Sequence, residues 1–215
     1  MMLLLELSRG RPDIPASLCN PIEAWLYQSH DVIEAAIGDV AFIQAIEDSA
    51  RVIAESLRRG GQIMIAGNGG SAAQAQHFAA ELVGRCERDR APLAAIALGT
   101  DPATLTALAN DYGYERVFER QLAALANHDT VLVAISTSGN SANILRAAEA
   151  ALKQGIPVIA MTGRGGGQLI QLSNLAIVTP IDGLITPLIQ QVHLIAAHAI
   201  CGLVEAILFR PGSPE

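Results

Sequence analysis

Apolar residues recur at helical spacing between residues 21 and 59. They fall on about every third or fourth position, and the period is interrupted at Gly38-Asp39. This spacing places apolar side chains on one face of a helix, whereas a glycine followed by an aspartate favours a break. The pattern predicts two consecutive helices that stop at Gly60-Gly61. The positions that carry it are Ile22, Trp25, Leu26, Ile33, Ala36, Phe42, Ile43, Ile46, Val52, Ile53 and Leu57.

Beyond Gly61, short apolar runs of strand length alternate with helical segments. The runs cover residues 63–66, 93–98, 131–135, 158–161 and 175–178. The helical segments begin at Ser71, Pro102, Glu115 and Ser141, with a short one near 167–172. Strands joined by helical crossovers pair in parallel, and helices cover both faces of such a sheet. The chain is therefore predicted to form a three-layer α/β/α domain around a five-stranded parallel sheet.

The last segment, residues 184–209, is the longest apolar stretch. Thr186-Pro187 suits the N-cap and first position of a helix. Polar residues interrupt the stretch and argue against a membrane-spanning helix; they are Gln190, Gln191, His193, His198 and Glu205. We expect a long C-terminal helix buried in the core or at a subunit interface, with His193 in a structural role.

Composition narrows the choice of function. A hydrophobic content of 51% in 215 residues is that of a globular protein. A net charge of -7 argues against general affinity for nucleic acid or for anionic membranes. The three cysteines, Cys19, Cys86 and Cys201, form no disulfide or zinc motif, and the opening leucine run is too short for a signal peptide. We expect a cytoplasmic protein.

Two polar loops each follow a predicted strand and open a predicted helix. The first, Gly67–Ser71, lacks the third glycine of a dinucleotide-binding loop and the lysine of a P-loop. The second, Ser136–Ser141, holds four hydroxyl residues in six positions. Backbone N–H groups and hydroxyls at helix N-termini suit a phosphate group, although Ser71 and Ser141 could also act as helix caps. The candidate ligands of an anion are Asn68, Gly69, Gly70, Ser71, Ser136, Thr137, Ser138 and Ser141.

Two pairs of polar residues are candidates for catalysis or metal binding. His77 and Glu81 stand four residues apart in a helical segment, so they share a face and form a possible acid/base pair or half of a zinc site. Gln190 and His198 stand eight apart in the apolar C-terminal segment, where polar groups need a partner. Arg85, four residues after Glu81, either pairs with it or lies at the rim of the site.

The loop at Asn110–Gly113 is open to two interpretations. It is a turn between helical segments, and Asp111 could in addition hydrogen-bond sugar hydroxyls.

The chain resembles the sugar isomerase (SIS) domain of bacterial phosphoheptose isomerases. The matching motifs are GNGGSA, HFAAEL-GR, ND-G, ISTSGNSANI, VIAMTG and the late glutamine with its histidines, over residues 21–209. The resemblance implies a cytoplasmic homotetramer that interconverts sedoheptulose 7-phosphate and D-glycero-D-manno-heptose 7-phosphate. It also implies a single SIS domain over residues 21–215. The segment before it, residues 1–20, holds Arg-Gly-Arg-Pro and Pro15 and is expected to form a loosely ordered N-terminal arm.

The resemblance also assigns roles. Ser71, Ser136, Thr137, Ser138 and Ser141 would hold the phosphate and nearby sugar oxygens, and Asp111 a sugar hydroxyl. A zinc ion would be bound by His77, Glu81, Gln190 and His198, and Glu81 and His198 would also form the acid/base pair.

One non-catalytic member of the subfamily binds the replication initiator DnaA, so a regulator of replication or a phosphosugar sensor is the alternative function. That member lacks the glutamate and the late histidine, which this chain has as Glu81 and His198. The chain departs from the isomerases at Pro187, where they usually carry an aspartate.

Overall fold

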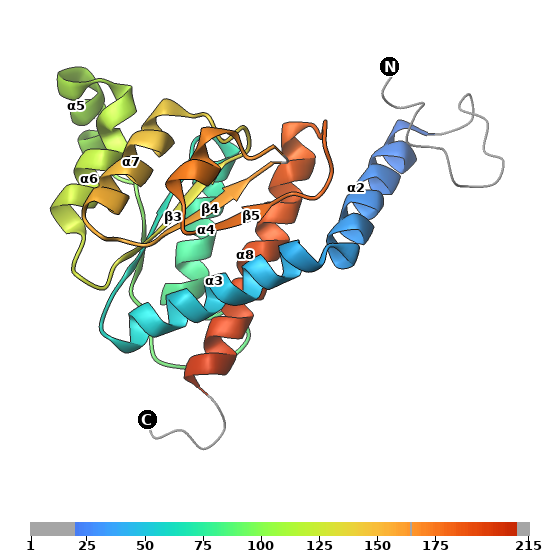
Figure 1. Cartoon of the computed structure of the whole chain (residues 1–215), viewed down its shortest axis with the longest axis horizontal. Coiled ribbons are helices and arrows are strands. Elements are labelled where there is room, and N and C mark those ends of the chain that lie inside the picture. The colour runs from blue at the N-terminus through green and yellow to red at the C-terminus, as the bar shows by residue number, and fades with distance from the viewer. Residues whose placement is uncertain (1–19, 164, 210–215) are drawn as a thin grey trace.

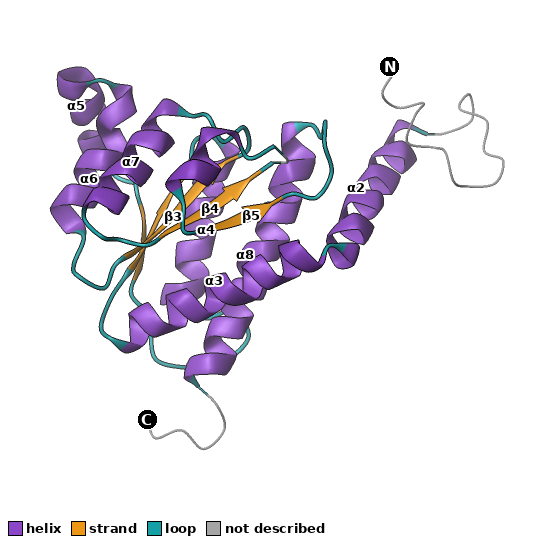
Figure 2. Ribbon diagram, in the orientation of Figure 1, coloured by secondary structure: helices purple, strands orange, loops and turns teal. Residues whose placement is uncertain are grey.

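The computed structural model describes residues 20–163 and 165–209 (Figure 1). The N-terminal arm expected at residues 1–20 lies, except for Asn20, outside the described residues, as do Cys19 and the last six residues. Helices surround one central sheet, and α2 (Pro21–Gly38) projects from the body of the molecule (Figure 2).

The sheet has five parallel strands in the order β2-β1-β3-β4-β5. The strands are β1 (Ile63–Ala66), β2 (Ala95–Ala97), β3 (Val131–Ser136), β4 (Val158–Thr162) and β5 (Leu175–Val178). All five predicted strands are confirmed, although β2 is only three residues long. Every residue of β1, β3 and β4 is buried, as expected for inner strands that helices cover on both faces.

Alternate residues of β1 contribute side chains to two separate hydrophobic cores, one on each face of the sheet. Ile63 and Ile65 pack with α3 (Val40–Arg58), α4 (Gly70–Val83) and α8 (Thr186–Leu208), whereas Met64 and Ala66 pack with α6 (Val117–Leu125) and α7 (Ala142–Lys153). This two-residue period is what a pleated strand imposes. The predicted three-layer α/β/α architecture is therefore confirmed, with α4 and α8 on the same face of the sheet.

The expected break between the first two helices is confirmed, since α2 ends at Gly38 and α3 begins at Val40. The Asp39 carboxylate accepts a hydrogen bond of 3.0 Å from the Phe42 N–H and caps α3. The apolar side chains of Ile37 and Val40, at this junction, are 71% and 78% exposed, and that of Ile22, in the first turn of α2, is 68% exposed. In the described chain, this part of the N-terminal helices has no core to cover it.

Three predicted helix starts need correction. α4 begins at Gly70 after Gly69, whose positive φ of 55° turns the chain, so Ser71 lies inside the helix and does not cap it. α8 begins at Thr186 with Ile185 as its N-cap, one residue earlier than expected. Glu115 belongs to a short 3₁₀ helix, Tyr114–Arg116, that follows α5 (Pro102–Tyr112) and precedes α6.

Helix α8 is a core helix. By length and composition alone it could cross a membrane, but ten of its residues are buried against the rest of the protein, among them His193 and Glu205. Burial lowers the pKa of His193 to about 4, so this imidazole is neutral at physiological pH. This agrees with the structural role expected for His193.

Candidate active site

Helices α4 and α8 bring together three of the four predicted catalytic or metal-binding residues. The His77 Nε2 lies 2.7 Å from the His198 Nε2, and 3.4 Å from the Glu81 carboxylate. The two imidazole rings meet edge to face with centroids 4.9 Å apart. The spacing along α4 places His77 and Glu81 on one face, and α8 supplies His198 from 121 residues away.

These three side chains form a candidate metal site. One ligand atom from each of His77, Glu81 and His198 lies within 4.8 Å of the others. Two imidazole nitrogens and a carboxylate oxygen are ligands that zinc accepts, and the tetrahedral geometry of such an ion separates two ligand nitrogens by roughly 3.3 Å. The two Nε2 atoms, 2.7 Å apart, lie closer together than this, so the rings would have to separate for both to bind one ion.

The fourth predicted ligand, Gln190, lies at the glycine loop. A Cβ on Gly70 would stand 2.5 Å from the Gln190 Nε2, so only glycine leaves room for this amide at the first residue of α4. The Gln74 side chain also donates a hydrogen bond of 2.5 Å to the Gln190 carbonyl. Gln190 thus connects α8 to the first turns of α4, on the N-terminal side of His77.

The hydroxyl-rich loop sits between the end of β3 and the start of α7. The Ser136 and Ser141 hydroxyls lie 3.0 Å apart, and Ser141 occupies the N-cap position without a capping hydrogen bond from its side chain. The Ser138 hydroxyl accepts a hydrogen bond of 3.2 Å from the Asn140 N–H. The hydroxyls therefore bond within the loop, and the N-terminal N–H groups of α7 remain suited to an anion.

A reciprocal pair of amides joins the two loops. Asn68 and Asn143 exchange two side-chain hydrogen bonds of 2.8 Å, and the Tyr114 hydroxyl donates a third, of 3.0 Å, to the Asn68 carbonyl oxygen. Asn143 is buried. The side chain of Asn68 thus holds the loops together. Neither Asn143 nor Tyr114 was expected at the site, because nothing in the local sequence marks them.

Two further predicted residues, Asp111 and Arg85, are exposed. Asp111 is the second-last residue of α5, and its carboxylate accepts a hydrogen bond of 2.8 Å from the Asn110 side chain. Since Tyr114 follows closely and reaches Asn68, this corner adjoins the glycine loop. Arg85 is exposed, and among the described residues it forms no ion pair with Glu81. The predicted ion pair is therefore not seen, and a position of Arg85 at the rim of the site stays a prediction.

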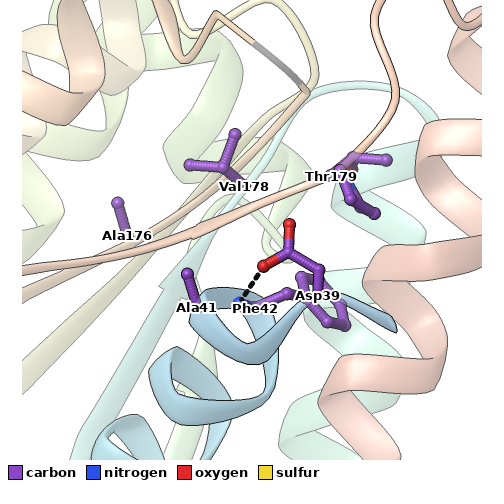
Figure 3. A pocket seen from close by; sticks show the side chains of 7 residues that line it. Asp39, Ala41, Phe42, Ala176, Val178 and Thr179 are labelled. Atoms are coloured by element: carbon purple, nitrogen blue, oxygen red, sulfur yellow. Dashed lines mark hydrogen bonds between the residues drawn. The ribbon is translucent and has the colours of Figure 1, made fainter. Parts of the chain in front are cut away.

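A hollow of about 280 Å³ lies elsewhere, between the start of α3 and the end of β5 (Figure 3). It is lined by Asp39, Ala41, Phe42, Ala176, Val178, Thr179 and Pro180. None of the predicted site residues contributes to it. Because its Asp39 carboxylate is used to cap α3, we assign the hollow no chemistry.

Comparisons with known proteins show which proteins the chain is similar to in sequence and in fold. The family model of the SIS domain matches residues 27–163. The chain is 52% identical over 172 residues to the phosphoheptose isomerase of Rhodospirillum rubrum, covering 80% of this chain and 89% of that one. It is 48% identical over 162 residues to the phosphoheptose isomerase of Helicobacter pylori strain P12, covering 75% and 83%.

Two solved structures give the same result. The phosphoheptose isomerase of Neisseria gonorrhoeae superposes with a TM-score of 0.79 and 38% identity, over 86% of this chain and 97% of that one. The phosphoheptose isomerase of Francisella tularensis gives 0.79 and 38%, over 85% and 95%.

We predict that Asn143→Ala destabilises the protein and loosens both loops. The change removes two hydrogen bonds and leaves the Asn68 amide short of partners, which costs about 1–3 kcal/mol. Urea unfolding measures the loss. Gln154→Ala is the control, because it removes a single exposed hydrogen bond at the other end of α7; equal stability of the two variants would contradict the prediction.

Proposed function

Because this chain belongs to the phosphoheptose isomerase family of SIS-domain proteins, we propose that it interconverts sedoheptulose 7-phosphate and D-glycero-D-manno-heptose 7-phosphate in heptose biosynthesis. The observation that carries the proposal is the convergence of His77, Glu81 and His198, with Nε2 atoms 2.7 Å apart. The family relationship indicates the substrate, and this cluster contains groups able to perform the reaction.

The phosphate is proposed to bind at the two loops. The N–H groups that open α4 and α7 and the hydroxyls of Ser71, Ser136, Thr137, Ser138 and Ser141 offer neutral donors. Helix N-termini favour anions through their dipoles. Neutral donors hold a phosphate less tightly than arginine pairs would, and this suits a substrate that must bind and leave in either direction.

The isomerisation moves protons between two adjacent carbons and their oxygens. One group must remove the proton from the carbon beside the carbonyl and return it to the neighbouring carbon, while another shifts protons between the two oxygens of an enediol intermediate. We assign the carbon proton to the Glu81 carboxylate and the oxygen protons to the His198 imidazole. Both groups share one small cluster with His77, so they can act on the same two carbons.

We further propose that His77, Glu81, Gln190 and His198 bind zinc. Such an ion would polarise the substrate carbonyl and stabilise the charge of the enediol. The support is the donor set of two imidazoles and one carboxylate described above. Gln190 completes the set if its side chain turns from Gly70 towards the histidines.

We propose a cytoplasmic location, because the three cysteines form no disulfide motif. The acidic charge of the chain agrees with a small phosphorylated substrate rather than a nucleic-acid partner. We also propose a homotetramer, because the N-terminal helices expose apolar side chains that a partner subunit would cover.

We predict that Glu81→Gln and His198→Ala each lower turnover of sedoheptulose 7-phosphate by about 10²-fold or more, since each removes one proton-transfer group. NMR of zinc-supplemented protein would follow the formation of the aldose heptose phosphate. His128→Ala is the matched control, because that side chain is 88% exposed and lies outside the cluster.

Full turnover by either variant would refute the assignment of its residue. Absence of turnover in the folded, zinc-loaded wild-type protein would refute sedoheptulose 7-phosphate as the substrate. It would leave an isomerase of another ketose phosphate and, as the favoured alternative, a non-catalytic regulator that binds DnaA or senses a phosphosugar.

Zinc should raise the thermal stability of the wild-type protein. At a free concentration of one hundred times Kd, binding to the native state alone adds about 2.7 kcal/mol to the free energy of unfolding. We expect His77→Ala and His198→Ala to lose this increase, and calorimetry with and without zinc would measure it. An undiminished increase in both variants would place the ion elsewhere.

The homotetramer predicts a solution mass of about four chains of 22.5 kDa each. The change Ile37→Lys, at a side chain that is 71% exposed, should lower that mass by placing a charge in the interface. Sedimentation equilibrium would measure both proteins. A monomeric wild-type protein would contradict the assembly.

A further inference from the structure

A buried ion pair connects the two helices that carry the proposed catalytic groups. The Arg90 guanidinium lies 3.1 Å from the Glu205 carboxylate, and the side chains are 2% and 0% exposed. Arg90 belongs to the segment that follows α4, and Glu205 belongs to α8, seven residues beyond His198. No proposed substrate, metal or proton-transfer contact involves either residue.

Glu205 fixes the chain that leaves α4. Its carboxylate accepts hydrogen bonds of 2.9, 3.0 and 3.0 Å from the backbone N–H groups of Cys86, Glu87 and Arg88, besides those of Arg90. Burial opposes ionisation of Glu205, but these backbone donors and the Arg90 charge together lower its pKa. Glu205 is therefore an anion around which the turn after α4 is folded.

Arg90 completes the connection from the other side. It donates hydrogen bonds of 2.8 and 2.9 Å to the carbonyls of Leu82 and Gly84 at the C-terminal end of α4, and one of 3.1 Å to the carbonyl of Ala91. It also donates one of 2.8 Å to the backbone carbonyl of Glu81. The Arg90 guanidinium thus binds the backbone of Glu81, whose carboxylate belongs to the proposed site. Through its ion pair with Glu205, it also binds α8, the helix that carries His198.

We propose that Arg90 and Glu205 are positioning residues, which set the Glu81 carboxylate against the His77 and His198 imidazoles for metal binding and proton transfer. The inference rests on the proposed function. The planar fork of arginine can meet several acceptors in fixed directions, which an ammonium group cannot do. Small displacements of a ligand or a base weaken a site even when the fold persists.

Arg90→Lys tests the proposal, because it keeps the charge and loses the fork. We expect zinc affinity, measured by competition with a chromophoric chelator, and kcat each to fall by about 10–100-fold. KM should stay within about threefold, since the phosphate loops do not contact Arg90. Glu205→Gln should act in the same direction, and it decides the question if Arg90→Lys does not fold.

Two controls separate positioning from stability. Arg88→Lys makes the same chemical change two residues away, where the guanidinium donates, within the described residues, a single hydrogen bond of 3.4 Å to the Phe209 carbonyl. Leu122→Ala opens a cavity in the core on the other face of the sheet. Both should keep zinc affinity and kcat at the wild-type values, measured at a temperature where every variant is folded.

The proposal is overturned if folded Arg90→Lys or Glu205→Gln keeps the zinc affinity and kcat of the wild-type protein, or if Leu122→Ala loses both to the same extent. A wild-type protein that binds zinc without turnover would refute the proposed function, and zinc affinity would then test the positioning role alone.

Discussion

The candidate site depends on the contact between α4 and α8 on one face of the sheet. Helix α4 follows β1, whereas α8 follows β5, the strand at the far edge. To reach α4, α8 must run back across the face of the sheet, and it can do so because its apolar side chains share one core with α3, α4 and the strands. The meeting of His77 with His198 is thus a consequence of core packing, which brings residues 121 positions apart into contact.

The second constraint is the shared edge of the parallel strands. Each of the two polar loops leaves a strand at its carboxyl end and opens a helix, so both loops lie on the same edge of the sheet. Their relative position is held by neutral hydrogen bonds, through Asn68, Asn143 and Tyr114. Neutral hydrogen-bond donors at helix N-termini are able to bind phosphate without a nearby arginine. Because the acidic chain as a whole does not attract anions, any phosphate site has to be a local one.

Local periodicity predicts the architecture well. The runs at 63–66 and 175–178 become strands with the expected bounds, and the break at Gly38 is where the pattern places it. The shared face of His77 and Glu81 also follows from their spacing. The arrival of His198 beside them could be expected from the family resemblance alone, since no local pattern indicates which helix α8 contacts.

The pairs that the sequence does not reveal are those made across long separations. Asn68 meets Asn143 over 75 positions, and Arg90 meets Glu205 over 115. Glu205 stands out as a charge within an apolar run, but its partner is one arginine among several near Glu81. Ser71 shows the opposite error: a serine before a helix is a reasonable cap, yet the turn at Gly69, with its positive φ of 55°, starts the helix one residue earlier.

The position of Pro187 bears on which sugar phosphate the chain would accept. It lies in the first turn of α8, three residues before Gln190 and on the same side of the helix. Proline there costs no backbone hydrogen bond, because the first N–H groups of a helix have no partner within it. It does remove the polar side chain that the family resemblance leads one to expect. Gln190, which directly follows this turn, lies against Gly70 of the glycine loop, whereas His77, Glu81 and His198 lie on other turns of α4 and α8. We therefore expect the change to affect which sugar phosphate is accepted more than the type of reaction.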